Sequence, residues 1–130
     1  MVTAARCDDR APDRAPDRAP DRAPASGPGR SQAAIDVVEV GGRRVWRVTL
    51  GPGWQHSIHG AGLTRLRRSC PEPHHGVVLS GTSRIFGADG SEKVLRPGDV
   101  YQVARHHDWR VEGDDPVVVL GIGDSRPACG

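Results

Sequence analysis

Turn signals recur about every eight to twelve residues along most of the chain, a spacing that favours a fold of many short strands. The signals are Gly41-Gly42, Gly51-Pro52-Gly53, Ala88-Asp89-Gly90, Arg96-Pro97-Gly98-Asp99 and Gly113-Asp114-Asp115-Pro116. The intervening segments are rich in β-branched and apolar residues, and no segment shows a helical period. The 17 glycines and 11 prolines fit short strands and turns better than helices. The sequence therefore predicts an all-β sandwich or barrel.

The expected strands follow from the segments between these signals. They are Ile35–Val40, Arg43–Leu50, Leu63–Arg67, Gly76–Leu79, Ser83–Phe86, Lys93–Leu95, Val100–Val103, Trp109–Val111 and Val117–Ile122. Gly41-Gly42 predicts a two-residue hairpin, because glycine tolerates the positive φ that such turns need. Pro97-Gly98 predicts a type II turn.

The first thirty residues have a different composition from the rest of the chain. Ala-Pro-Asp-Arg is repeated at Ala11–Arg14, Ala15–Arg18 and Ala19–Arg22. Proline at every fourth position disfavours helix, and the repeat offers no side chains for a core. We expect a disordered arm over residues 1–30, a single β domain over residues 31–125 and a short tail over residues 126–130.

Charge and cysteine content limit the classes of partner and the cellular location. The formal net charge is only +2, which gives no electrostatic reason to expect nucleic acid or a membrane surface as partner. There is no apolar run of membrane-spanning length and no secretory h-region. Cys7, Cys70 and Cys129 are an odd number at no framework spacing. We therefore expect free thiols rather than a structural disulfide, and a reducing, cytoplasmic location.

Two histidine pairs frame the segment from Cys70 to Trp109. His74-His75 follows Cys70-Pro-Glu-Pro, and His106-His107 precedes Asp108. The two pairs can meet if the strands fold back on one another. Neighbouring residues on a strand point to opposite faces, so both members of a pair cannot face the interior. Such histidines can be hydrogen-bonded wall residues or metal ligands, and the residues alone leave both interpretations open.

The order of several short motifs resembles the cupin superfamily, in particular small single-domain cupins. The motifs are Gly53-Trp54, Cys70-Pro-Glu-Pro-His74, Val78-Leu79-Ser80-Gly81, Asp89-Gly90, Arg96-Pro97-Gly98-Asp99-Val100-Tyr101, His107-Asp108 and Gly113-Asp114-Asp115-Pro116. Together they span most of the expected domain. The resemblance implies a conical double-stranded β-barrel, or jelly roll, preceded by the disordered arm.

The resemblance also implies where metal ligands would lie. Metal-binding cupins use an H-x-H pair, then a glutamate, then a histidine in the second motif. Here the H-x-H positions fall among Arg67, Arg68, Ser69 and Cys70, which include no histidine. The glutamate position falls on His74 and the second-motif histidine on His107, so these two are expected to face inward. With Cys70 as a third donor, the set can hold a divalent metal such as zinc, iron, manganese or nickel.

Two functions follow as hypotheses from this incomplete ligand set. The first is a barrel pocket that binds a small molecule, lined by Trp54, His56, Cys70, His74, His107 and Trp109. The alternative is a metal-dependent enzyme of the isomerase or dioxygenase type that uses His74 and His107. Ordinary core packing explains Trp54 and Trp109 equally well, and no catalytic residue is assigned. A homodimer that covers the exposed edge of Ile35–Leu50 is a further hypothesis.

Overall fold

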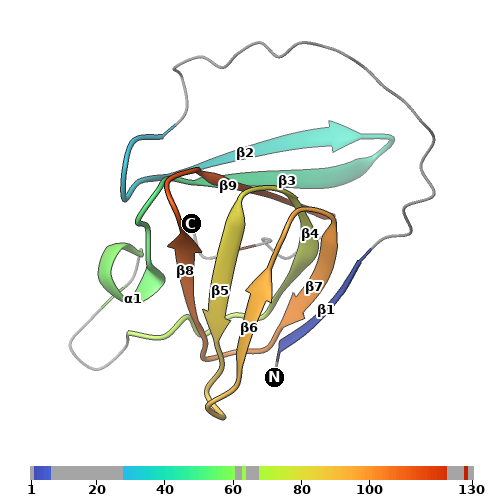
Figure 1. The fold of residues 1–130 in the computed structure, drawn as a ribbon. Helices are drawn as coiled ribbons and strands as arrows, with labels where there is room; N and C mark the ends of the chain where they lie inside the picture. Colours follow the sequence, from blue (N-terminus) through green and yellow to red (C-terminus); the bar gives the residue numbers. More distant parts are fainter. Residues whose placement is uncertain (1, 7–27, 61–62, 64–67, 123–127, 129–130) are drawn as a thin grey trace.

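The computed structural model describes residues 2–6, 28–60, 63, 68–122 and 128, and within them the fold is almost entirely β (Figure 1). Its elements are β1 (Val2–Arg6), β2 (Ala33–Val40), β3 (Arg43–Leu50), α1 (His56–His59), β4 (His74–Ser80), β5 (Thr82–Phe86), β6 (Glu92–Leu95), β7 (Asp99–Val103), β8 (Asp108–Glu112) and β9 (Val117–Ile122). The expected all-β fold class is confirmed. No helix in this part of the chain is long and apolar enough to cross a membrane.

The strands form two antiparallel sheets that face each other. The larger sheet has the strand order β1-β7-β4-β9-β3-β2, and the smaller has the order β6-β5-β8. Consecutive strands β4 and β5 lie in different sheets, as do β7 and β8, so the chain passes repeatedly from one sheet to the other. This alternation encloses the space between β4, β7 and β9 on one side and β5, β6 and β8 on the other (Figure 1).

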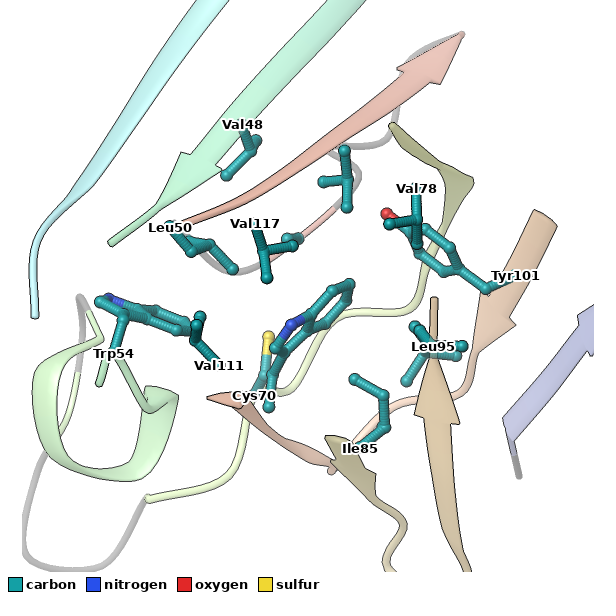
Figure 2. Close-up of a cluster of buried hydrophobic side chains, with 14 residues drawn as sticks. Val48, Leu50, Trp54, Cys70, Val78, Ile85, Leu95, Tyr101, Val111 and Val117 are labelled. Carbon is teal, nitrogen blue, oxygen red and sulfur yellow. The ribbon is translucent and has the colours of Figure 1, made fainter. Parts of the chain in front are cut away.

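The hydrophobic core fills that space. Val48, Leu50 and Val117 approach it from the larger sheet, and all three are fully buried. Ile85, Leu95 and Val111 approach it from the smaller sheet, and Figure 2 shows these side chains directed toward one another. Burial of side chains of this size contributes about 1.5 to 3 kcal/mol each, which makes this layer the main source of stability.

The turns have the geometry that their sequences predict. Gly41 and Gly42 have φ values of 57° and 78°, as a two-residue turn with two positive φ angles requires, and they join β2 to β3. Gly98 has φ of 91°, the value expected at the third position of a type II turn. Apart from Leu63–Arg67, each expected strand is present, with ends shifted by at most two residues. Residues 64–67 lie outside the described part of the chain.

Three features differ from the expectations. Val2–Arg6 forms β1, which pairs antiparallel with β7 at one edge of the larger sheet, so the expected arm does not include these residues. This segment contains no proline and can therefore donate every backbone hydrogen bond of a strand. A single turn of helix, α1, interrupts the strands. Ala128, placed in the expected tail, is fully buried within the core cluster. The repeats themselves lie outside the described residues.

Candidate metal centre

Backbone pairing brings Cys70 next to His107, although they are far apart in sequence. The Cys70 amide donates to the His107 carbonyl at 2.8 Å, and the His106 amide donates to the Cys70 carbonyl at 2.6 Å. β4 begins four residues later at His74, whose register partner on β7 is Val103. These contacts place three side chains with metal-binding atoms at the same end of the barrel.

The three side chains form a compact and buried cluster. One donor atom from each of Cys70, His74 and His107 lies within 4.8 Å of the other two. The Cys70 Sγ atom is 3.2 Å from His74 Nε2, and the two imidazole rings pack edge to face with centroids 5.1 Å apart. All three residues are at most 3% exposed. Among the described residues, this is the one group of three or more histidine, cysteine and acidic side chains with such spacing.

A backbone hydrogen bond orients His107. Its Nδ1 atom lies 2.7 Å from the carbonyl oxygen of Ala104, and because a carbonyl only accepts, Nδ1 carries the proton. The Nε2 atom then has the lone pair that a metal ion needs. Metal-binding histidines commonly have such a partner on the other ring nitrogen. The sequence did not indicate this partner, because any residue type supplies a carbonyl.

Burial keeps the same imidazole neutral. It lowers the pKa of His107 from its ordinary 6.5 to about 4, and the nearby His74 and His56 contribute in the same direction. The hydrogen bond to Ala104 and the Asp108 carboxylate act against this shift. A metal ion binds only the neutral form of histidine, so at neutral pH His107 is already in the protonation state that favours binding.

Two imidazoles and a sulfur fit a divalent metal such as zinc. Zinc takes nitrogen and thiolate ligands at about 2.0 to 2.3 Å, and three protein ligands leave a coordination position for a small molecule. The donor set and the orientation of His107 both suit such an ion. Cys70 can contribute only as a thiolate, since the sulfur of a disulfide carries no negative charge.

Cys70 is disulfide-bonded in this structure. The expectation of free thiols is therefore wrong, and the argument from cysteine content to a reducing compartment loses its basis. The other cysteines of the chain, Cys7 and Cys129, lie outside the described residues. Cysteine spacing did not reveal the bond because pairing depends on which residues the fold brings within bonding distance.

Each histidine pair has one buried and one exposed member. His74 and His107 are 2% and 1% exposed, whereas His75 and His106 are exposed. His75 follows His74 on β4 and points to the opposite face. His106 has φ of 63° and lies in the turn that connects β7 to β8. The inward orientation of His74 and His107 is thus present in the structure, while their role as ligands stays a prediction.

His56, expected in the pocket, is buried on α1. Burial lowers its pKa, against the effects of the Asp108 carboxylate and a hydrogen bond with the Ser69 backbone. Its Nδ1 atom is buried without a hydrogen-bond partner in the described part of the protein. Its ring packs at 6.2 Å from that of Trp54, which is also buried. His56 lies outside the three-residue cluster but helps to lower the pKa of His107.

Asp108 holds α1 against β8. Its carboxylate accepts hydrogen bonds from the Ser57 amide at 2.9 Å, the Ser57 hydroxyl at 2.8 Å and the Gln55 side-chain amide at 2.6 Å. Gln55 is the N-cap of α1 and makes no side-chain cap of its own, so Asp108 satisfies the free amide of the first turn. These contacts give Asp108 a capping role at the first turn of α1.

Trp109 lies in the centre of the core and is fully buried. Its indole N–H donates to the Ser83 hydroxyl at 2.8 Å, and its ring packs edge to face against Tyr101 with centroids 5.4 Å apart. Trp54 is also part of the core cluster. Both tryptophans therefore pack in the core, and their expected role in lining a ligand pocket stays a prediction.

A hollow of about 290 Å³ lies elsewhere, on the β4, β7 and β9 part of the larger sheet. The residues that line it are His75, Gly76, Val77, Val100, Tyr101 and Leu120. Val77 is the register partner of both Val100 and Leu120, so these three form a row across the strands. They point away from the core, since the adjacent Val78 and Val119 are buried. The hollow is mostly apolar and does not include the metal-binding atoms.

Comparisons with known proteins bear on the fold. No protein-family model and no curated protein matches the sequence. Among solved structures, a cupin superfamily protein from Desulfitobacterium hafniense is 16% identical with a TM-score of 0.47, the match covering 73% of this chain and 81% of that one. The cupin_2 domain of an XRE family transcriptional regulator from Enterobacter cloacae is 20% identical with a TM-score of 0.47, covering 72% and 98%.

A further similar structure is recombinant oxalate oxidase in complex with glycolate. It is 16% identical with a TM-score of 0.46, and the match covers 75% of this chain and 54% of the oxidase. Cupin superfamily proteins are among the solved structures similar to this chain. Likeness at this level concerns the fold alone.

Proposed function

We propose that this protein binds a divalent metal ion inside the barrel through His74 and His107, with Cys70 as a third ligand in its thiolate form. The observation that carries the proposal is the buried cluster of three donor atoms within 4.8 Å of one another. Imidazole nitrogen and thiolate sulfur are the ligand types that a divalent ion such as zinc accepts, and their close spacing in a buried site supports a shared metal ion.

The remaining residues of the site prepare it for the ion. Ala104 keeps the His107 proton on Nδ1 and so directs Nε2 at the cluster. The apolar surroundings of His107 keep its imidazole neutral. The antiparallel bridge between Cys70 and His107 fixes the distance between their strand segments. The bound ion would act as a Lewis acid toward a molecule in an open coordination position.

A small molecule that completes the coordination is the second part of the proposal. Three protein ligands leave at least one position on a four-coordinate ion. A ligand with a carboxylate or another oxygen donor would take that position, and the buried residues Trp54, His56 and Trp109 would contribute to the walls of its pocket. An isomerase or dioxygenase type of reaction remains the alternative to plain binding, because each needs an open position on a metal.

Metal analysis of four single variants tests the first part. The protein is purified without chelator, and its metal content is measured by plasma mass spectrometry before and after loading with zinc. We expect one ion per chain in the wild type and loss of the ion in His74→Ala and His107→Ala. His75→Ala and His106→Ala, which remove the exposed neighbours, are the matched controls and should retain it. Equal metal content in all four variants would disprove the site.

Thermal unfolding of the zinc-loaded protein tests the second part. A panel of small carboxylates and phosphates is added at rising concentration, and a ligand that binds the folded state raises the melting temperature by mass action. We expect a shift in the loaded wild type and in the loaded His75→Ala control, and none in His74→Ala, which should not hold the ion. No shift with any member of the panel would count against small-molecule binding and leave metal binding standing.

A further inference from the structure

Cys70 combines two chemical states that exclude each other. Its Sγ atom lies 3.2 Å from His74 Nε2, within the cluster proposed to hold a metal ion. The same sulfur is engaged in a disulfide bond. A thiolate is a strong ligand for zinc, whereas a disulfide sulfur has neither the charge nor the basicity that ligation requires. The number of protein ligands at the site therefore depends on the oxidation state of Cys70.

We propose that the disulfide of Cys70 is a reversible redox switch for the metal site. In the oxidised state only His74 and His107 face the ion, and in the reduced state Cys70 completes a three-ligand set. This inference rests on the metal site proposed above. It adds that a thiol reductant controls the occupancy of the site, a form of regulation that follows from where this disulfide lies.

The backbone around Cys70 allows the switch to work without refolding. The amide and carbonyl groups of Cys70 are both hydrogen-bonded to the segment of His106 and His107. These two bonds do not involve the sulfur and hold the Cα atom in place in either state. Reduction then leaves Sγ beside His74, where a metal ion can bind it without rearrangement of β4.

The chemical step is a thiol–disulfide exchange. A dithiol reductant attacks the sulfur of the partner cysteine, the S–S bond breaks, and Cys70 leaves as a thiolate. The second thiol of the reductant then displaces the partner cysteine and closes a disulfide within the reductant. Two electrons pass from the reductant to the protein, and each thiolate takes up a proton unless a metal ion binds it.

Cobalt binding to four forms of the full chain tests the proposal. Oxidised wild type, wild type reduced with dithiothreitol and desalted without oxygen, Cys7→Ser/Cys129→Ser and Cys70→Ser are titrated with Co²⁺. The double variant covers both other cysteines, so it leaves Cys70 without a disulfide partner in the chain. Free thiols are counted in each form after unfolding. Thiolate–cobalt charge-transfer absorption and the dissociation constant are the two readouts.

We expect the charge-transfer band in the reduced wild type and, without any reductant, in the double variant. Oxidised wild type and Cys70→Ser should lack the band and bind cobalt at least about tenfold more weakly, since loss of a ligand costs no less than loss of a supporting contact. Equal affinity and no band in every form would overturn the switch while metal binding by the histidines stands. Absence of cobalt binding in every form would overturn the metal site, and the switch with it.

Discussion

The two faces of β4 and β7 have opposite chemical character. On the inner face, His74 lies 2% exposed among metal-binding atoms. On the outer face, Val77 and the 44% exposed Val100 belong to a mostly apolar hollow. A sheet with one solvated face normally has apolar residues inside and polar residues outside. Elsewhere on the inner face of these two strands, Val78, Tyr101 and Val103 are buried in the core.

The difference shows which features reflect folding and which point to function. The apolar part of the inner face stabilises the barrel and needs no further explanation. The imidazoles on the inner face cost desolvation, and the apolar groups on the outer face gain nothing from exposure. The metal ion that we propose would offset the desolvation cost of the imidazoles on the inner face.

The largest expected effect comes from the core on the inner side. Trp109→Ala should lower the free energy of unfolding by about 3 to 5 kcal/mol, because it opens a cavity and leaves the buried Ser83 hydroxyl without its indole partner. Denaturant unfolding measures the change. Val100→Ala on the outer face is the control and should cost less than about 1 kcal/mol. Comparable losses in the two variants would show that the faces do not differ as described.

An effect of intermediate size is expected from pH. In the metal-free protein the pKa of His107 is about 4 when folded and about 6.5 when unfolded. As pH falls from 6.5 toward 4, the His107 imidazole therefore becomes protonated in the unfolded chain but stays neutral in the folded protein. The free energy of unfolding should fall by about 2 to 3 kcal/mol over this range. Well above pH 6.5 the imidazole is neutral in both the folded and the unfolded protein, so the contribution of His107 to the free energy of unfolding no longer changes with pH.

Denaturant unfolding at a series of pH values checks this. His107→Gln retains a donor group near Ala104 but cannot titrate, so its stability should depend less on pH over the same range. His106→Gln, altered at the exposed neighbour, should follow the wild type. A pH profile that is the same in His107→Gln and wild type would mean that the imidazole is not kept neutral by burial.

The smallest change in stability is expected at the outer face of β2, where a homodimer remains a proposal. β2 is an edge strand, and Val38 is 54% exposed on it. Val38→Lys should leave the unfolding free energy within about 0.5 kcal/mol of wild type, as is usual for exposed positions. If two copies pair through this edge, the added charge should shift light-scattering mass from dimer toward monomer. A wild type that is monomeric at every concentration would remove the proposal.

Local features of the sequence were sufficient to predict most of the fold. Turn residues located the strand ends, and Gly98 has the backbone angle its position requires. The two-residue period of a strand also predicted that the side chains of His74 and His75 point to opposite faces of the sheet. Short apolar segments were less informative: β1 contains only five residues, and α1 has a single turn, too short to show a period.

The choice of His74 and His107 as the inward-facing histidines came from the resemblance of the motifs. Residue types and spacing alone determined the fold class, the turns and the opposite orientation of neighbouring residues on a strand. Those properties depend on backbone preferences and on burial, both of which act over a few residues. Only the tertiary structure showed which side chains and backbone groups meet. Asp108 accepts a hydrogen bond from the first turn of α1, and the Ala104 carbonyl accepts the His107 Nδ1 proton. The tertiary structure also decided that Cys70 can form a disulfide, because that bond forms only where folding brings two sulfurs within bonding distance.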